Sequence, residues 1–175
     1  MKLKLALAAL TLSLQFSTAQ AHSVWLEPSS TVLSKAAYIT VAGAAGNDKF
    51  HYNHAALRGL NENFTAIAPD GSTVAPENLM AGKLRTVFDL NLTQSGTYRL
   101  AVASEGIMAS WKEGEQTKRF RGNAEAFAKD VPANATDLRV NEGVNRLETF
   151  VTVGKPTDIK PIGKGLELVP ITHPN

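Results

Sequence analysis

The chain contains no cysteine. It therefore cannot form disulfides, and any exported form must be stabilised by its hydrophobic core. The same absence excludes a catalytic thiol and cysteine sulfur as a metal ligand. Any metal site in this chain has to be built from nitrogen and oxygen donors.

Other catalytic signatures are also missing. There is no Gly-x-Ser-x-Gly motif for a serine nucleophile and no glycine-rich phosphate-binding loop. Glu113 and Glu115 are a pair of carboxylates, but they lie in a charged stretch that we expect to be solvated. These absences indicate a protein that is not an enzyme.

Long apolar runs are scarce, and the clearest one, Leu5 to Leu14, lies near the start of the chain. Lys2 and Lys4 precede it, and Ala19-Gln20-Ala21 supplies small residues at the positions that a signal peptidase prefers. The run is about half of the roughly 20 residues that a membrane-spanning helix needs. The pattern predicts that residues 1–21 are a bacterial signal peptide and that the mature protein begins at His22.

No excess of charge remains after this cleavage. Without Lys2 and Lys4, the 18 basic residues fall to 16, which equals the 16 acidic residues. A balanced charge does not favour nucleic acid or an anionic membrane surface as partner. We expect residues 22–175 to form one periplasmic domain without a stable membrane span.

Apolar and polar residues alternate through the mature chain, which is the pattern of half-buried strands. The clearest examples are residues 84–92 and the Tyr98, Leu100 and Val102 series, separated by the turn-forming stretch 93–97. We interpret these two segments as a hairpin. The Ser-Gly-Thr-Tyr string at residues 95–98 resembles the start of a late strand in immunoglobulin-like domains, where a tyrosine can bond back to the corner before it. The residues expected on one face of the first segment are Leu84, Thr86, Phe88, Leu90 and Leu92.

Further short strands, with turns such as Pro69-Asp70-Gly71-Ser72, favour an all-β antiparallel sandwich over a parallel α/β sheet. Asn123 can cap one short peripheral helix over residues 123–129. The charged stretch 112–121 is interpreted as a hairpin tip or surface loop. The other expected strands cover residues 37–42, 64–68, 107–111, 147–153 and 166–169.

The histidines provide the candidate metal ligands. After cleavage, His22 can offer its α-amino nitrogen and its ring to one ion as a chelate, and one more imidazole, His51 or His54, gives three nitrogen donors suited to copper, nickel or zinc. His51 and His54 are three residues apart, so only a loop or turn brings both to one ion. Glu27 is an additional carboxylate candidate. The alternative is that His22 merely marks the cleavage point and the other two histidines belong to a polar loop.

Trp25 and Trp111 allow two interpretations. Exposed indoles form platforms for carbohydrate, whereas buried indoles contribute large apolar areas to a core. Packing in the sandwich is the favoured interpretation of both.

Two stretches resemble a known family. They are HSVWLEP at residues 22–28, and RLETFVTVG at 146–154 followed by GKGLELVPITHPN at 163–175. Together they resemble bacterial periplasmic proteins that are defined as a domain of unknown function and often labelled a nickel or cobalt uptake periplasmic component. The resemblance implies an immunoglobulin-like sandwich and a role beside the import of metal or metallophore. Members of that family usually continue into a second β-rich module, so this chain resembles the first module only.

From these observations we expect a periplasmic accessory protein that binds divalent nickel, cobalt, copper or zinc, or a chelate of one, through His22, His51 and His54. The rival hypothesis is a structural or interaction module that docks on a membrane transporter or an outer-membrane receptor. Loss of the three histidines would abolish the first function and leave the second intact.

Overall fold

The computed structural model of the chain describes residues 22–57, 59–163 and 167–174. The expected signal peptide, residues 1–21, lies outside the described residues. Within the described part, no helix is long and apolar enough to cross a membrane.

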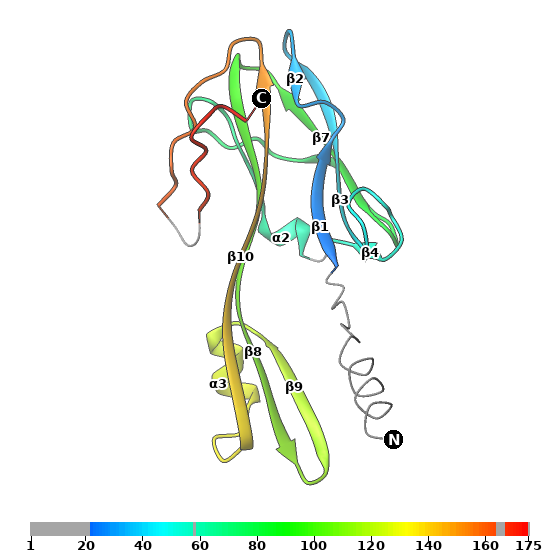
Figure 1. Cartoon of the computed structure of the whole chain (residues 1–175), viewed down its shortest axis with the longest axis vertical. Helices are drawn as coiled ribbons and strands as arrows, with labels where there is room; N and C mark the ends of the chain where they lie inside the picture. The colour runs from blue at the N-terminus through cyan, green and yellow to red at the C-terminus, as the bar shows by residue number, and fades with distance from the viewer. Residues whose placement is uncertain (1–21, 58, 164–166, 175) are drawn as a thin grey trace, which may run out of the picture.

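Two mainly antiparallel sheets face each other as a sandwich (Figure 1). In the first sheet the strand order is β1-β3-β7-β6, and β4 pairs with β3; in the second it is β2-β10-β8-β5, and β9 pairs with β8. The strands are β1 (Ser23–Pro28), β2 (Val32–Leu33), β3 (Ala37–Gly46), β4 (Ala55–Ala56), β5 (Phe64–Ile67), β6 (Glu77–Ala81), β7 (Thr86–Leu92), β8 (Gly96–Glu113), β9 (Gln116–Gly122) and β10 (Thr136–Val153). The helices are the one-turn α2 (Leu60–Asn63) and α3 (Ala124–Asp130).

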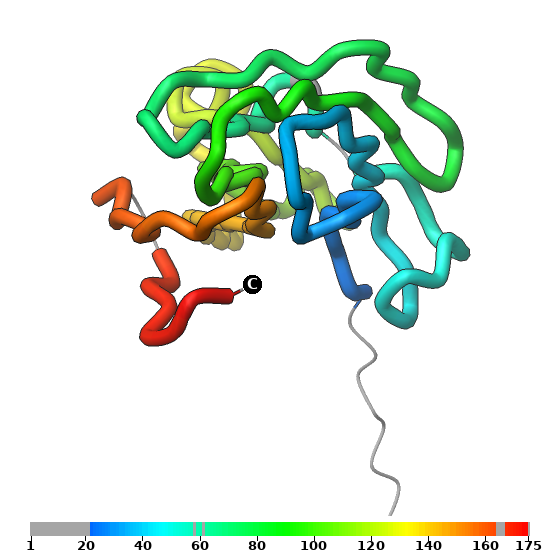
Figure 2. Tube along the Cα trace, turned by 90° about the horizontal axis from the view of Figure 1, so that it is seen from above, coloured from blue at the N-terminus to red at the C-terminus, as the bar shows by residue number. Residues whose placement is uncertain are grey.

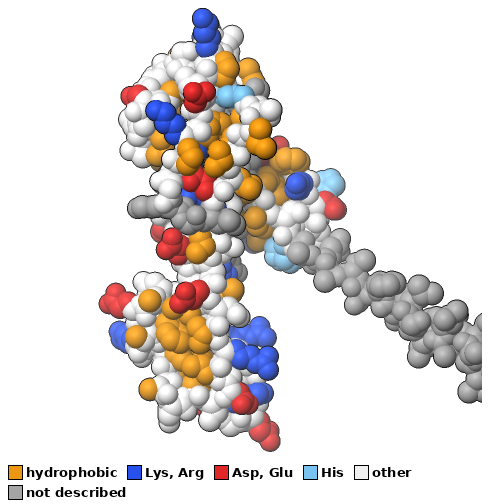
Figure 3. Space-filling model, turned by 60° about the vertical axis from the view of Figure 1, so that its left-hand side comes forward, with side chains coloured by type: hydrophobic (Ala, Val, Ile, Leu, Met, Phe, Trp, Pro, Cys, Tyr) orange, Lys and Arg blue, Asp and Glu red, His pale blue; other side chains and the backbone are white. Residues whose placement is uncertain are grey.

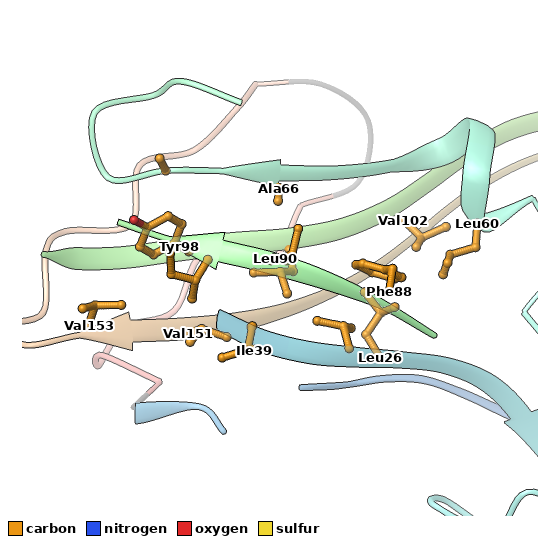
Figure 4. Packing of buried hydrophobic residues seen from close by; sticks show 14 residues of the cluster. Leu26, Ile39, Leu60, Ala66, Phe88, Leu90, Tyr98, Val102, Val151 and Val153 are labelled. Carbon is orange, nitrogen blue, oxygen red and sulfur yellow. The ribbon is translucent and has the colours of Figure 1, made fainter. Parts of the chain in front are cut away.

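The core lies between the two sheets (Figure 4). Strands of both sheets direct alternate side chains into it, as expected for a half-buried strand. The all-β sandwich expected from the sequence is therefore confirmed. The largest fully buried side chains are Tyr98, Phe88, Ile39, Leu60, Leu90, Leu92, Leu100, Val41 and Val151.

Strand β7 follows the predicted alternation. Its buried residues are Thr86, Phe88, Leu90 and Leu92, and the residues between them are half-buried. Leu84 was expected on the same face, but it precedes the strand and its side chain is 45% exposed.

The predicted hairpin between β7 and β8 is wrong. Strand β7 pairs with β3 and β6 in the first sheet, whereas β8 pairs with β10, β5 and β9 in the second. The turn at residues 93–95 therefore carries the chain from one sheet to the other. The alternation of apolar and polar residues shows which face of a strand is buried, but not which strand pairs with it. Strands β7 and β8 bury their apolar faces in the same core from opposite sheets.

The expected tyrosine corner is present at this crossing. The Tyr98 hydroxyl donates to the carbonyl oxygen of Gln94 at 3.1 Å and accepts from the Gln94 backbone N–H at 2.6 Å. Since Tyr98 is fully buried, these two bonds satisfy its hydroxyl and fix the turn before β8.

Strands β8 and β10 are each 18 residues long and pair along most of their length. They run beyond the sandwich and, with β9 and α3, form a projecting arm (Figure 1). The expected strands 107–111 and 147–153 are parts of these longer strands. The hairpin at 112–121 is confirmed, because Glu113 pairs with Gln116 across Gly114, and the helix is confirmed by the Asn123 side chain, which accepts from the Ala126 N–H at 2.8 Å.

After β10 the chain has no further strand in its described part. The expected strand 166–169 is wrong at residues 167–169, and Leu166 lies outside the described residues. This segment folds back beside β10 (Figure 2). It is fastened by one ion pair, between Glu167 and Arg99 of β8, and by side-chain hydrogen bonds instead of a strand ladder.

Candidate functional site

The candidate site lies where β1 begins. His22 directly precedes β1, and the first pair of the β1–β3 ladder joins Ser23 to Gly46, the last residue of β3. The loop 47–54 follows Gly46 at once, so antiparallel pairing brings this loop next to His22. Residues separated by about thirty positions in the sequence meet here because of strand register.

His22 and His54 form the centre of the site. Their rings are stacked, with centroids 3.8 Å apart and planes inclined by 18°. The His22 Nδ1 atom also lies 3.0 Å from the Asn47 side-chain oxygen. Both histidines are exposed, so either ring can turn without disturbing the core.

The stacked arrangement has a chemical consequence. Each ring nitrogen directs its lone pair within the ring plane, so two nearly parallel rings cannot both point at one ion. One ring must turn, and the His22 ring must give up its contact with Asn47 if Nδ1 is the ligand. The α-amino group of a mature His22 would then complete three nitrogen donors, a set that suits copper, nickel and zinc.

Short contacts hold the loop that carries His54. The Asn47 N–H donates to the Asn53 side-chain oxygen at 3.1 Å, and the Asn53 N–H donates to the His51 carbonyl at 2.9 Å. Phe50 has φ 63°, the left-handed region that non-glycine residues adopt in tight turns. The loop is thus a compact turn.

His51 faces a different group. Its Nδ1 atom lies 3.7 Å from a carboxylate oxygen of Asp48, and its side chain is 71% exposed. Within residues 22–57, 59–163 and 167–174, no group of three or more His, Cys, Asp or Glu side chains is arranged to hold a metal ion. The fold brings His22 and His54 together, and no contact joins His51 to that pair among the described residues.

Glu27 is engaged by Tyr52, whose hydroxyl donates a short hydrogen bond to the Glu27 carboxylate. Burial, followed by this carboxylate, raises the pKa of the Tyr52 hydroxyl. The Arg85 guanidinium lies over the Tyr52 ring, 5.0 Å from its centroid. Glu27 therefore orients the loop through Tyr52, and its carboxylate is directed at a phenol instead of at His22.

Trp25 forms the floor beneath this loop. It is only 4% exposed and makes edge contacts with Phe50, at 6.0 Å between centroids, and with Tyr52, at 5.7 Å. Packing is confirmed for Trp25, which cannot be an exposed carbohydrate platform, while Trp111 lies half-buried on the arm.

The sequence did not reveal Asn47, Tyr52 or Arg85 as parts of this site. Asn47 could not be predicted because the sequence pattern does not show the register between β1 and β3. Tyr52 stands between the two loop histidines, and its aromatic ring was the one available signal. Arg85 directly precedes β7, far along the chain, and no feature of the sequence linked it to this site.

Fold and site together define a class: a two-sheet β protein with a histidine pair at one end of the sandwich and a projecting three-stranded arm. The chain belongs to the family described as "Domain of unknown function (DUF4198)", whose model matches residues 19–175. The expected domain-of-unknown-function family is thus confirmed, and the nickel or cobalt label stays a prediction. No curated protein and no solved structure matches the chain.

Proposed function

We propose that the mature protein is a non-catalytic periplasmic accessory protein that binds a divalent transition metal ion, or its chelate, in connection with metal uptake. The ion would be bound by the amino group and ring of His22 and by the ring of His54. The candidate ions are nickel, cobalt, copper and zinc.

The observation that carries this proposal is the 3.8 Å stacking of His22 on His54. Of the two loop histidines, His54 is the one next to the expected mature N-terminus. A chelate formed by a terminal amine and its own ring needs only one further imidazole to reach three nitrogens. Three protein donors leave coordination positions open, which suits a protein that passes its ion on.

Both rings of the stacked pair are exposed, which leaves room for a chelate as well as for a bare ion. An open site can accept an ion that keeps part of its own ligand shell, such as water or a small metallophore. The Asp48 and His51 side chains, both about 70% exposed, stand in the same loop and provide polar contacts for such a shell.

The decisive experiment is calorimetric titration of Cu²⁺, Ni²⁺, Co²⁺ and Zn²⁺ into protein that begins at His22, confirmed by mass spectrometry, and carries no polyhistidine tag. We expect at least one ion to bind with Kd below about 10 µM, close to −7 kcal/mol. One added glycine before His22, or His54→Ala, should weaken binding at least about tenfold. Binding weaker than this limit, or binding unchanged by the added glycine, would refute the proposal.

His51→Ala is the matched control, because it removes an imidazole from the same loop without touching the stacked pair. We expect it to change the affinity by less than about threefold, since the altered residue makes no contact with His22 or His54 among the described residues. A loss as large as that of His54→Ala would assign the third nitrogen to His51 instead.

A further inference from the structure

The arm has two chemically different faces. Because directly opposed residues of antiparallel strands direct their side chains to the same face, the ladders of β9, β8 and β10 define three rows on one of them. We call this the basic face. Its rows are Arg119–Ser110–Arg139, Arg121–Met108–Asn141 and Thr117–Lys112–Thr136.

The cations of the basic face are Lys112, Arg119, Arg121 and Arg139, and all four are exposed. In the described part of the chain none of them forms an ion pair; the arm's one ion pair, Lys118 with Glu113 at 3.2 Å, lies on the other face. Asp137, in the bulge near the tip, is the one carboxylate around the hollow that Ser110, Thr117 and Arg139 also line. The face therefore keeps a net positive charge, unlike the mature chain as a whole.

The opposite face carries exposed apolar side chains beside β10, on either side of Glu142. Helix α3 covers the β9 side of this face, where Phe127 contacts Phe120 at 5.7 Å between centroids and Ala109 is buried. Val140 and Val144 of β10 are left 44% and 49% exposed. Apolar side chains gather on one face of the arm, and lysine and arginine side chains gather on its flank (Figure 3).

The outer edge of β10 is open along the arm. Thr136 and residues 139–145 pair with β8 on one side, and β2 reaches β10 only at Thr152 and Val153. No other strand of the described residues pairs with that stretch. An open edge presents free backbone N–H and C=O groups on which another strand can pair.

We propose that the outer edge of β10 binds an extended segment of a partner protein in which acidic residues alternate with apolar ones. Successive side chains of an added strand point to opposite faces. Its acidic residues would meet Arg139 on β10, within the positive field of the basic face, and its apolar residues would cover Val140 and Val144. An anionic lipid surface would use the cations alone, leaving the open edge and the two valines without a role.

Strand binding at the outer edge of β10 does not depend on metal binding. It gives the interaction-module hypothesis a specific surface and a specific partner chemistry. The sandwich end with His22 and the arm are separate parts of the molecule, so each can be tested while the other is left unchanged.

The test is fluorescence anisotropy of a labelled peptide of about nine residues, a usual strand length, in which Glu and Val alternate. The titrant is the complete mature protein. We expect saturable binding that salt weakens. Three control peptides should bind at least about tenfold more weakly. One has Glu and Val in separate blocks and lacks the alternation, one has Lys in place of Glu and lacks the negative charge, and one has backbone N-methyl groups and cannot pair with the edge of β10.

The matched variants are Arg119→Glu with Arg139→Glu on the arm, and Lys35→Glu with Lys83→Glu on the sandwich. All four side chains are exposed, and each pair changes the net charge equally. The arm variant should lose at least about tenfold in peptide affinity, and the sandwich variant should keep it. Absence of peptide binding, equal binding of the block peptide, equal loss in both variants, or binding only to phosphatidylglycerol vesicles would overturn the proposal.

Discussion

Arg99 Nη1 lies 2.7 Å from Glu167 Oε1, so an ion pair joins β8 to a residue 68 positions later. Both side chains are less than a tenth exposed. Arg99 also donates to the Lys160 carbonyl at 2.7 Å, and Glu167 accepts from the Ile162 and Gly163 N–H groups at 2.6 and 3.0 Å. Arg99 thus fastens the segment that follows β10 to the sandwich, together with Thr97, which bonds to Thr157 and His173.

Arg99→Met should loosen this segment and lower the melting temperature by roughly 5–10 °C. Removal of one partner leaves the Glu167 carboxylate in a largely enclosed place without its cation, which is costly. Thermal unfolding and limited proteolysis are the measurements, with earlier cleavage expected between residues 155 and 174. Arg119→Met, which removes an exposed arginine of the arm, is the control. An equal change in both variants would show that the ion pair has no special role.

The same cluster predicts a dependence of stability on pH. The Ile162 N–H, the Arg99 guanidinium and the Gly163 N–H hold the pKa of Glu167 at about 2, below its ordinary value of 4.5. Because the folded-state pKa is depressed, the carboxylate stabilises the fold above about pH 4.5, and that contribution is lost as the pH falls towards 2.

Chemical denaturation at a series of pH values would measure this effect. Between about pH 4.5 and 2, the free energy of unfolding should fall more steeply for the parent protein than for Glu167→Gln, which cannot titrate there. Other carboxylates contribute equally to both proteins, so the difference between the two curves isolates Glu167. Parallel curves across this range would contradict the prediction.

Tyr98→Phe should destabilise the sandwich by about 1–2 kcal/mol, because it leaves the Gln94 N–H and C=O without the hydroxyl that now pairs with both. The ring itself would keep its packing, so the fold should be retained. The control is Tyr38→Phe, since Tyr38 is 58% exposed on β3. A loss below about 0.5 kcal/mol for Tyr98→Phe would show that the corner is not fixed by these bonds.

The sequence predicted burial better than it predicted pairing. Phe88 and Tyr98 were correctly placed on buried faces, because side-chain period is a local property of a strand. Their strands were wrongly joined as a hairpin, because the choice of neighbour depends on contacts distant in sequence. Likewise, residue type identified His22 and His54, but only the register of β1 on β3 shows that His54 is the one beside His22.

The C-terminal segment was mispredicted for a related reason. Apolar residues such as Leu168 and Val169 favoured a strand, yet both are exposed, at 82% and 58%. This segment is anchored by the Glu167 carboxylate, whose cation, Arg99, comes from a strand much earlier in the chain, and by hydrogen bonds of Thr97 to Thr157 and His173. A long-range ion pair leaves no periodic signal in the sequence.

Gly46→Ala tests whether the loop 47–54 positions the proposed metal ligands. Gly46 pairs with Ser23, next to His22, and a methyl group there would lie 2.9 Å from Trp25 Cη2 and overlap the His51 carbonyl oxygen. The backbone of the loop would have to move away from β1, and His54 would move with it. We expect the metal affinity to fall at least about tenfold, which corresponds to about 1.4 kcal/mol, because displacement of one ligand by about 1 Å readily costs that much. We also expect the fluorescence of Trp25 to change.

Gly143→Ala is the matched control, because the nearest atom to its added methyl group would be 3.7 Å away, an ordinary contact on the distant arm. It should leave metal affinity and the fluorescence of Trp25 unchanged. If Gly46→Ala alters the Trp25 fluorescence but not the metal affinity, the loop has moved without weakening metal binding. His54 would then not be a ligand of the ion. If both properties change together while the melting temperature stays within a few degrees, the close approach of β3 to this loop is what brings His54 to His22, the expected mature N-terminus.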